Sequence, residues 1–193
     1  MYQRFFFIAV LLVCMSFNTS DTNEDNLFVK ITKESYLSIK GKSNVNSFHC
    51  DYNTYMLEQE VFLTYRKNAN RILFDDAKLE LKNTGFDCGN KMMNKDFHKL
   101  LESEKYPNIS FKLLEVIPHN EVFDARVAIQ IAGVTNEYIF AVALNNSVEC
   151  LDGLLCINIT DFGLEPPKKL LGAVVVKEDI EVHFKFFIEN LRA

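Results

Sequence analysis

The stretch LELKNTGFDCGNKMMNKDFHKLLESEKYPNISF, residues 79–111, combines two kinds of local order. At both of its ends, apolar and polar residues alternate, which predicts strands with one buried face. Between these strands, Phe97 and Leu100 recur at the spacing of an amphipathic helix, with charged residues around them. We therefore expect one short helix inserted between two strands.

The ends of this helix are predicted from two local signals. Asn94 has a side-chain oxygen that can accept a backbone N–H of the first turn, and the Tyr106-Pro107 step disfavours helix in the residue before the proline. These signals predict a helix from Asn94 to Lys105. We expect it to act as a lid, with Phe97 and Leu100 packed against the rim of a β structure.

The rest of the chain reads as a succession of strands. Short turn signals separate the alternating segments, for example at Asn145-Asn146 and Asp152-Gly153. Connections this short favour antiparallel neighbours, and closing the sheet removes its exposed edges. We predict an all-β antiparallel barrel of about eight strands, which has room for either a side-chain core or one small ligand.

The composition leaves both uses of the interior open. The 193 residues are 48% hydrophobic and include 17 Phe, 7 Tyr and no Trp. Phenylalanine in this excess can fill a core or line a cavity for an apolar ligand. The aromatic residues that alternation places on inward faces, and that we select as candidate lining, are Phe48, Phe111, Phe140, Phe184 and Phe186.

Two cysteine pairs are candidate disulfides. Cys50 and Cys88 each share a face with a phenylalanine, and a bridge between them would tie an early strand to the base of the helical insertion. Cys150 and Cys156 would lie opposite each other if a turn at Asp152–Leu154 made a hairpin. The alternative for either pair is free thiols that pack as small apolar residues.

The N-terminus has the pattern of a signal peptide. Arg4 precedes an apolar run from Phe5 to Val13, which is too short to span a bilayer, and cleavage is predicted after Ser16. Lipidation of Cys14 is the weaker alternative. We expect segment 1–16 to be removed, residues 17–26 to form a flexible lead-in, and the mature protein to be periplasmic or secreted without an integral membrane segment.

Charge and motif content exclude several function classes. Without Arg4, 20 basic side chains remain against 26 acidic ones, so the mature chain carries about −6 and lacks the positive surface that nucleic acids require. The histidines have no metal-ligand spacing, and no nucleophile motif or phosphate loop is present. We expect no metal, no cofactor and no catalytic residue. The four scattered histidines are His49, His98, His119 and His183.

Several segments together resemble the YceI-like family. The likeness lies in FDCGNKMMNKDFHKLLESEKYPNISF (86–111), SIKGKSNVNSFHC (38–50), IQIAGVTNEYIFAVAL (129–144), INITDFGLEPP (157–167) and KEDIEVHFKF (177–186). They cover a domain of residues 27–190 in the right order. The paired cysteines and Asn136, where many relatives carry a basic residue, are departures from the family pattern.

The resemblance implies an extended, eight-stranded, lipocalin-like barrel in an exported bacterial protein. Its implied ligand is a long apolar lipid such as a polyisoprenoid, an isoprenoid quinone or a fatty amide, bound without covalent chemistry. The alternative is a structural or interaction module of the cell envelope whose barrel is filled by its own side chains. A homodimer is compatible with either reading.

Overall fold

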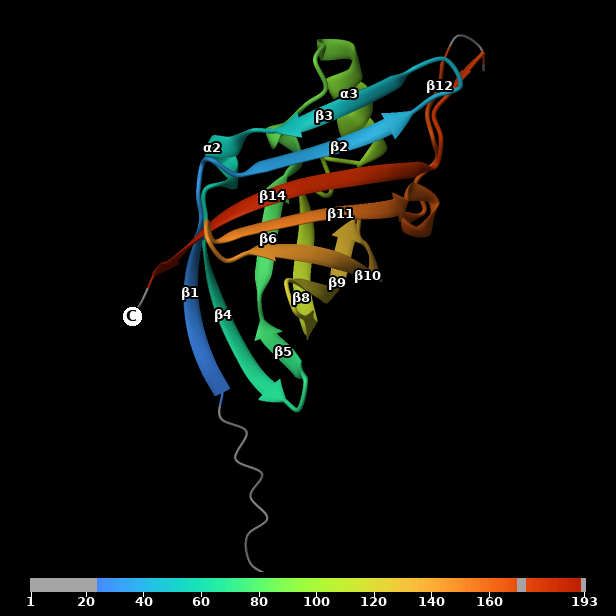
Figure 1. Ribbon diagram of the computed structural model, residues 1–193. Helices are drawn as coiled ribbons and strands as arrows, with labels where there is room; N and C mark the ends of the chain where they lie inside the picture. Colours follow the sequence, from blue (N-terminus) through green and yellow to red (C-terminus); the bar gives the residue numbers. More distant parts are fainter. Residues whose placement is uncertain (1–23, 170–172, 192–193) are drawn as a thin grey trace, which may run out of the picture.

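The computed structural model describes residues 24–169 and 173–191, and eight antiparallel strands in it form a closed ring (Figure 1). The ring closes because β14 pairs with β1, from Phe28↔Leu191 to Ile31↔Ile188. This arrangement confirms the predicted all-β antiparallel fold. Around the ring, the strands are β1 (Glu24–Ile31), β4 (Gln59–Asn68), β5 (Arg71–Asp76), β8 (Asn108–His119), β9 (Val122–Ile131), β10 (Val134–Asn145), β11 (Cys150–Asn158) and β14 (Asp179–Leu191).

Further strands extend the ring at one end. β2 (Tyr36–Lys42) pairs with β14, β3 (Ser47–Tyr52) with β2, and β7 (Phe86–Asp87) with β3. β6 (Lys78–Lys82) pairs with β8, and β12 (Lys168–Lys169) and β13 (Val174–Val175) form a small separate hairpin. In Figure 1, β2, β3, β11 and β14 run across the view, whereas β1, β4, β5 and β8 run down it. The molecule therefore consists of two strand layers that cross.

The described part of the chain has short helical elements at the ends of its strands. They are α2 (Thr54–Leu57), α3 (Lys91–Leu100) and the 3-10 turns η1 (Asn83–Gly85) and η2 (Ile159–Phe162). The single helix predicted from the sequence is α3, and the additional turn α2 connects β3 to β4. Asn53 caps α2 by accepting a hydrogen bond from the Tyr55 backbone N–H at 3.0 Å. Leu57 in this turn is completely buried, which explains why so short a helix is held in place.

The predicted bounds of the inserted helix were wrong at both ends. Asn90 is the N-cap, and its side chain accepts a hydrogen bond from the Met93 backbone N–H at 2.9 Å. Asn94 instead accepts one from the Cys88 backbone N–H at 2.7 Å. At the other end, Glu102 adopts a left-handed conformation with φ 49°, and the Ser103 N–H bonds to the His98 carbonyl, as in a Schellman motif. The helix therefore ends well before Tyr106-Pro107.

Two other boundaries differ from expectation. β1 begins at Glu24, inside the segment predicted to be a flexible lead-in, because the long strand β4 offers a partner edge as far as Arg66. β11 runs without interruption through Asp152-Gly153, where a turn was predicted, and pairs with β14 over its whole length. Backbone pairing with a longer neighbour therefore decided both boundaries.

A bulge in β8 separates the interior from a charged outer cluster. The register of β8 against β9 shifts between Leu113 and Glu115. Glu115 is 6% exposed, but it is paired with Arg71 at 2.9 Å and with Arg126 at 3.1 Å. Val116, the next residue, is buried against the apolar face of β9 through its partner Ala125. The bulge thus lets one strand supply both the core and a satisfied ion cluster.

Candidate functional site

The candidate site is the inner face of the ring, where strand alternation directs aromatic side chains. On β14, buried Val182 is followed at two-residue intervals by Phe184 and Phe186, which are only half-buried. The ring of Phe184 lies 4.8 Å from that of Phe186 and 6.0 Å from that of Phe140 on β10, in an edge-to-face arrangement. The structure therefore brings three of the five predicted lining residues together.

Glycine at position 153 makes room for this aromatic group. Gly153 of β11 is paired with Phe184 of β14, and the Phe184 ring covers the position that a Cβ atom of residue 153 would occupy. The same arrangement is found where Phe48 of β3 covers its partner Gly41 of β2. In both pairs, a large ring and a residue without a side chain together fill the space of two ordinary residues.

The other two predicted lining residues lie elsewhere on the inner face. Phe111 of β8 pairs with Ile129 of β9 on one side and with Leu79 of β6 on the other, and it is half-buried against the core. Phe48 is also half-buried, but its ring lies over Gly41 in the β2–β3 extension. Phe111 and Phe48 therefore belong to other parts of the wall than the aromatic group of β10 and β14.

The sequence analysis missed part of this surface. Tyr65 of β4 pairs with Phe74 of β5, and their rings are 6.1 Å apart. Both are half-buried, as are Leu27 and Leu63, which pair across β1 and β4. The pairing of β4 with β5 shifts between Thr64 and Tyr65, because β5 has Asp75 as an extra residue, so the pattern of apolar residues alone gives little signal there.

The two residues predicted to form a lid hold α3 against the end of the ring. Phe97 and Leu100 both pack against the buried core, and the Phe97 ring lies 5.3 Å from that of Phe86 in β7. Phe86 is 4% exposed and contacts Tyr52 of β3 at 4.8 Å between ring centroids. Phe97 of α3 is thus held by Phe86 of β7, which is itself packed on Tyr52 of β3.

A buried amide strengthens the same attachment. Asn83, which is 1% exposed, donates hydrogen bonds from Nδ2 to Ser103 Oγ at 2.9 Å and to the Tyr106 carbonyl at 2.8 Å. The backbone carbonyl oxygen of Asn83 lies 3.2 Å from Nε2 of His98 in α3. One residue at the end of β6 therefore fixes both the helix and the segment that follows it.

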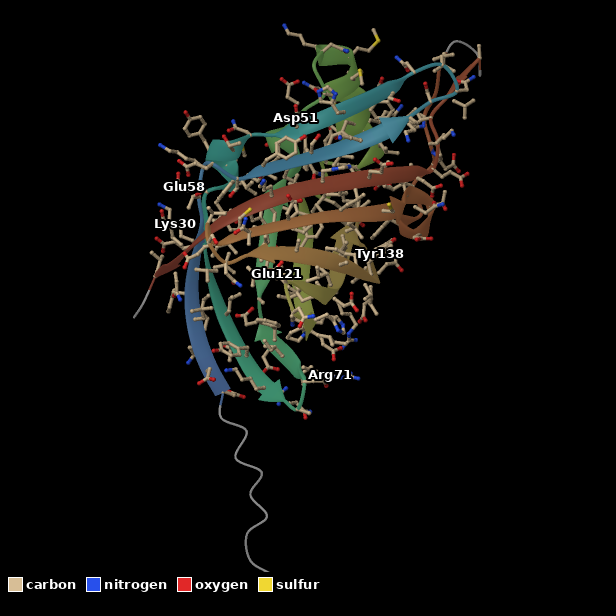
Figure 2. All side chains as sticks on the ribbon, viewed as in Figure 1. Lys30, Asp51, Glu58, Arg71, Glu121 and Tyr138 are labelled. Atoms are coloured by element: carbon tan, nitrogen blue, oxygen red, sulfur yellow. A yellow bond between two sulfur atoms is a disulfide. The ribbon has the colours of Figure 1, made fainter. Side chains whose placement is uncertain are left out.

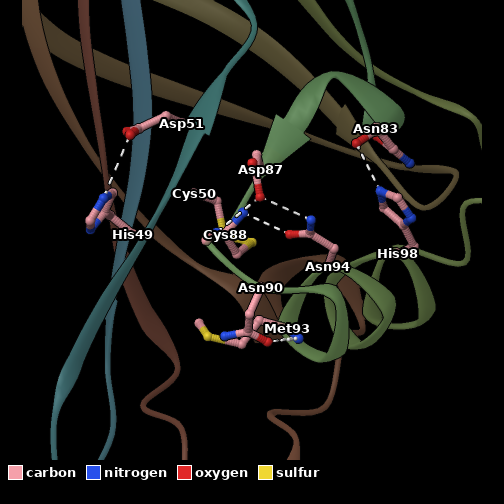
Figure 3. Close-up of a disulfide and its surroundings, with 11 residues drawn as sticks. His49, Cys50, Asp51, Asn83, Asp87, Cys88, Asn90, Met93, Asn94 and His98 are labelled. Atoms are coloured by element: carbon pink, nitrogen blue, oxygen red, sulfur yellow. Dashed lines mark hydrogen bonds and ion pairs between the residues drawn. A yellow bond between two sulfur atoms is a disulfide. The ribbon is translucent and has the colours of Figure 1, made fainter.

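Cys50 and Cys88 form a disulfide, as predicted from their positions (Figure 3). The bridge joins β3 to the segment between β7 and α3. Next to it, Asp87 accepts hydrogen bonds from the Asn94 side chain and the Gly89 N–H, both at 3.0 Å. These bonds, the Asn94 bond first, hold the pKa of the Asp87 carboxyl below its usual value.

The second predicted disulfide was wrong. Cys150 and Cys156 are both free, because they lie six residues apart on the single straight strand β11. Cys150 is buried, and burial raises the pKa of its thiol, whereas Cys156 is exposed.

Polar chemistry is concentrated away from the aromatic interior. Among the described residues, no group of three or more His, Cys, Asp or Glu side chains is arranged to hold a metal ion. His49 lies 3.5 Å from Asp51, and His183 lies 3.4 Å from Glu181, on the outer faces of their strands. A groove of about 510 Å³ on the outside of the β10–β11 turn is bordered by charged residues that include Glu121 and Lys185. This groove does not suit an apolar chain.

Tyr138 on β10 is a polar residue of the inner face that the sequence analysis did not select. Tyr138 is labelled in Figure 2. Its hydroxyl donates a hydrogen bond to Asp161 Oδ2 at 2.9 Å, and its ring stacks on that of Phe162 with 6.1 Å between the centroids. Burial, followed by this bond to a carboxylate, raises the pKa of Tyr138. Tyr138 therefore remains a neutral hydrogen-bond donor at physiological pH.

Within the described residues, no helix has both the length and the apolar character needed to cross a bilayer. The predicted signal peptide and Cys14 lie outside these residues.

Comparison with known proteins identifies the family. The structure of BcnA from Burkholderia cenocepacia is similar with a TM-score of 0.60 and 17% identity, covering 82% of this chain and 99% of that one. A YceI protein from Campylobacter jejuni matches with a TM-score of 0.48 and 16% identity, covering 62% of this chain and 74% of that one. No curated protein sequence matches this chain. A sequence model of the YceI-like domain matches residues 19–187. The chain therefore belongs to the YceI-like family.

Proposed function

We propose that this protein binds one long apolar lipid inside the ring and carries or sequesters it without covalent chemistry. The ligand class is a polyisoprenoid, an isoprenoid quinone or a fatty amide. The observation that supports this most directly is the half-burial of Phe140, Phe184 and Phe186 on the same face as the fully buried core. Inward aromatic side chains that keep accessible surface are suited to cover an apolar guest.

The energetics favour a long chain over a small ligand. Burial of apolar surface contributes about 25 cal/mol per Å², so each added isoprenoid or methylene unit in contact with the wall adds to affinity. Ordering the chain opposes this gain, and a preformed wall reduces that cost. The disulfide and the packed strands around α3 provide a wall that is formed before the ligand arrives.

Export is part of the proposal. The Cys50–Cys88 disulfide is characteristic of proteins that fold in an oxidising compartment, which agrees with the signal peptide expected from the N-terminal sequence. We expect the mature protein to begin at Phe17 and to reside in the periplasm or outside the cell. Intact-mass measurement of the processed protein tests this, and a lipid-modified Cys14 or an uncleaved N-terminus would contradict it.

Lipid binding is tested by native mass spectrometry of the purified protein, followed by organic extraction and mass analysis of the extract. A matched pair of variants on β11 locates the ligand. Leu151 faces inward and packs against the core, whereas Leu154 faces outward and is 46% exposed. We expect Leu151→Trp to lose the bound lipid, because the larger ring fills the interior, and Leu154→Trp to keep it.

Two outcomes would overturn the proposal. One is recovery of no lipid from the wild-type protein together with a stoichiometric protein partner, which would favour an envelope interaction module. The other is equal lipid content in both tryptophan variants when each is folded by circular dichroism. In that case the lipid would not occupy the interior of the ring.

A further inference from the structure

β10 and β11 are neighbours in the ring but are paired over only part of their length. Four residue pairs join them, from Val142↔Gly153 to Asn145↔Cys150. On their other edges, β10 pairs with β9 over ten residues and β11 pairs with β14 over nine. Beyond Val142 and Gly153 the two strands diverge, as Figure 1 shows to the right of their connecting turn. The wall of the ring therefore contains a fork.

The 3-10 turn η2 fills this fork. Phe162 is 2% exposed, and its ring stacks on Tyr138, which projects from the part of β10 that is not paired with β11. In Figure 1, η2 is the orange coil at the end of β11, and Figure 2 labels Tyr138 close to it. One aromatic pair thus takes the place of backbone pairing between the strands.

Few bonds hold η2 to β10. Asp161 accepts a hydrogen bond from the Tyr138 hydroxyl at 2.9 Å, and its backbone carbonyl accepts one from Asn136 Nδ2 at 2.8 Å. Gly163 follows with a left-handed φ of 70°, which ends the turn. Opening the fork breaks the Tyr138 and Asn136 bonds and moves the Phe162 ring, which is packed in the core, but it breaks no strand pair.

Apolar residues border the fork outside the ring as well as inside. On the outer face, Ile139 is 69% exposed and Leu154 is 46% exposed. On the inner face, Phe140 and Phe184 begin the half-buried aromatic group. An apolar chain that passed through the fork would have apolar contacts on both sides of the wall.

The alternative entrance, under α3, is held much more firmly. A disulfide at Cys88, the buried Asn83 and the Phe97–Phe86 contact all fix that end of the molecule. Displacing α3 would break the Phe97–Phe86 contact and the bond between His98 and the Asn83 backbone carbonyl, and the disulfide would still hold the chain just before α3 against β3. Opening the fork releases two hydrogen bonds and one ring stack and moves the buried Phe162 ring out of the core, and no covalent bond opposes it.

From this geometry we propose that the fork between β10 and β11 is the entry site for the apolar chain, with Phe162 and Tyr138 as its gate. This inference rests on the proposed lipid-binding function and adds the place of entry and the charge class of the ligand.

Carboxylates beside the fork select against anionic chains. Asp161 accepts a hydrogen bond from the Tyr138 hydroxyl, and Asp179 accepts one from Asn158 Nδ2 at 3.1 Å. Among the described residues, neither carboxylate is ion-paired with a lysine or an arginine. A negatively charged head group would be repelled by these two carboxylates. We therefore expect the fork to admit an uncharged apolar chain more readily than an anionic one.

Stopped-flow fluorescence of the full-length mature protein with N-phenylnaphthylamine, an uncharged apolar probe, tests the gate. Tyr138→Phe removes the bond to Asp161 but keeps the ring, and we expect association and dissociation both to accelerate about fivefold. Phe162→Ala removes the gate ring and is expected to accelerate both on the order of tenfold or more. Because both rates change together, the equilibrium affinity for the probe stays nearly constant.

Control variants separate the fork from the other end of the ring. Leu100→Ala loosens α3 and should leave the probe kinetics unchanged if entry is at the fork. Anilinonaphthalenesulfonate, which has the same aromatic body with a negative charge, should bind at least several-fold more weakly than the neutral probe. Faster kinetics in Leu100→Ala with unchanged kinetics in Tyr138→Phe would overturn the inference. Equal binding of the two probes would overturn its charge specificity.

The outcomes also distinguish this inference from the proposed function. Absence of probe binding to the wild-type protein, together with absence of bound lipid, contradicts lipid binding itself. Normal probe binding with rates that neither gate variant alters contradicts only the entry site.

Discussion

The α3 and η2 segments both cover the strand ring, but they are attached in very different ways. α3 is joined to its surroundings by the Cys50–Cys88 disulfide, by the buried Asn83 and by the Phe97 ring on Phe86. η2 is held to β10 by two hydrogen bonds and one ring stack. A closed ring that binds a guest needs a rigid wall and a place where the wall can open. The comparison assigns the first role to the α3 end and the second to the fork.

The difference also concerns the interior behind each segment. The residues behind α3 are almost fully buried, as shown by Tyr52, Leu81 and Phe86 at 4%, 1% and 4% exposure. The inward side chains that β10 and β14 contribute beside the fork include Phe140 and Phe184, which are only half-buried. Both segments therefore pack against the core, since Phe162 of η2 is also 2% exposed, but the α3 end has a disulfide in addition, and η2 lies next to the aromatic group with accessible surface.

The largest effect is expected from removing the disulfide. Loss of the Cys50–Cys88 bridge, which closes a loop with a sequence separation of 38, should lower the free energy of unfolding by roughly 3 to 4 kcal/mol. Urea unfolding of Cys50→Ala/Cys88→Ala against the wild type measures this. Cys156→Ser, at an exposed free thiol, is the control and should unfold like the wild type. An unchanged midpoint in the double variant would remove the argument that the α3 end is rigid.

A smaller effect is expected at the fork. Tyr138→Phe loses one exposed hydrogen bond and should lower the free energy of unfolding by at most about 1 kcal/mol. Tyr65→Phe is a suitable control, because among the described residues Tyr65 has a ring contact with Phe74 and no hydrogen bond from its hydroxyl. If Tyr138→Phe lowered the free energy of unfolding as much as removal of the disulfide does, the attachment of η2 to β10 would not be the weaker of the two.

The smallest effect is a pH dependence beside the disulfide. The pKa of Asp87 in the folded protein is held below its usual value, first by the Asn94 bond and then by the Gly89 N–H. A carboxyl with a lowered folded pKa adds stability above its unfolded pKa of about 4, and this contribution disappears as pH falls through the folded pKa. Asp87→Asn should therefore be less stable than the wild type near neutral pH and equal to it in strong acid. A stability difference that grew on acidification would contradict this assignment.

Much of the fold could be predicted because strand alternation is a local signal. The inward positions of Phe184 and Phe186, the antiparallel order and the Cys50–Cys88 pair follow from residue spacing and turn signals, and the structure has all of them. Family resemblance added the expected domain of residues 27–190, and the sequence model of the YceI-like domain matches residues 19–187.

The errors arose where tertiary contacts override local signals. Asp152-Gly153 has the composition of a turn, yet Gly153 lies within β11 because the Phe184 ring requires the space above it. The end of α3 depends on Glu102 in a left-handed conformation, which a sequence without glycine at that position does not indicate. The fork between β10 and β11 was not predictable, because it depends on where the backbone pairing of these two strands ends, and no local sequence signal marks that point.

The central claim, that the inside of the ring receives an apolar chain, can be measured with tryptophan as a reporter. The chain has no Trp, so Phe140→Trp and Ile139→Trp each introduce a single fluorophore, one on the inner face of β10 and one on its outer face. The measurement is quenching by a brominated long-chain alcohol, an uncharged apolar ligand. The account predicts strong, saturable quenching in Phe140→Trp and little in Ile139→Trp. Equal quenching in the two variants, or none in Phe140→Trp, would contradict it.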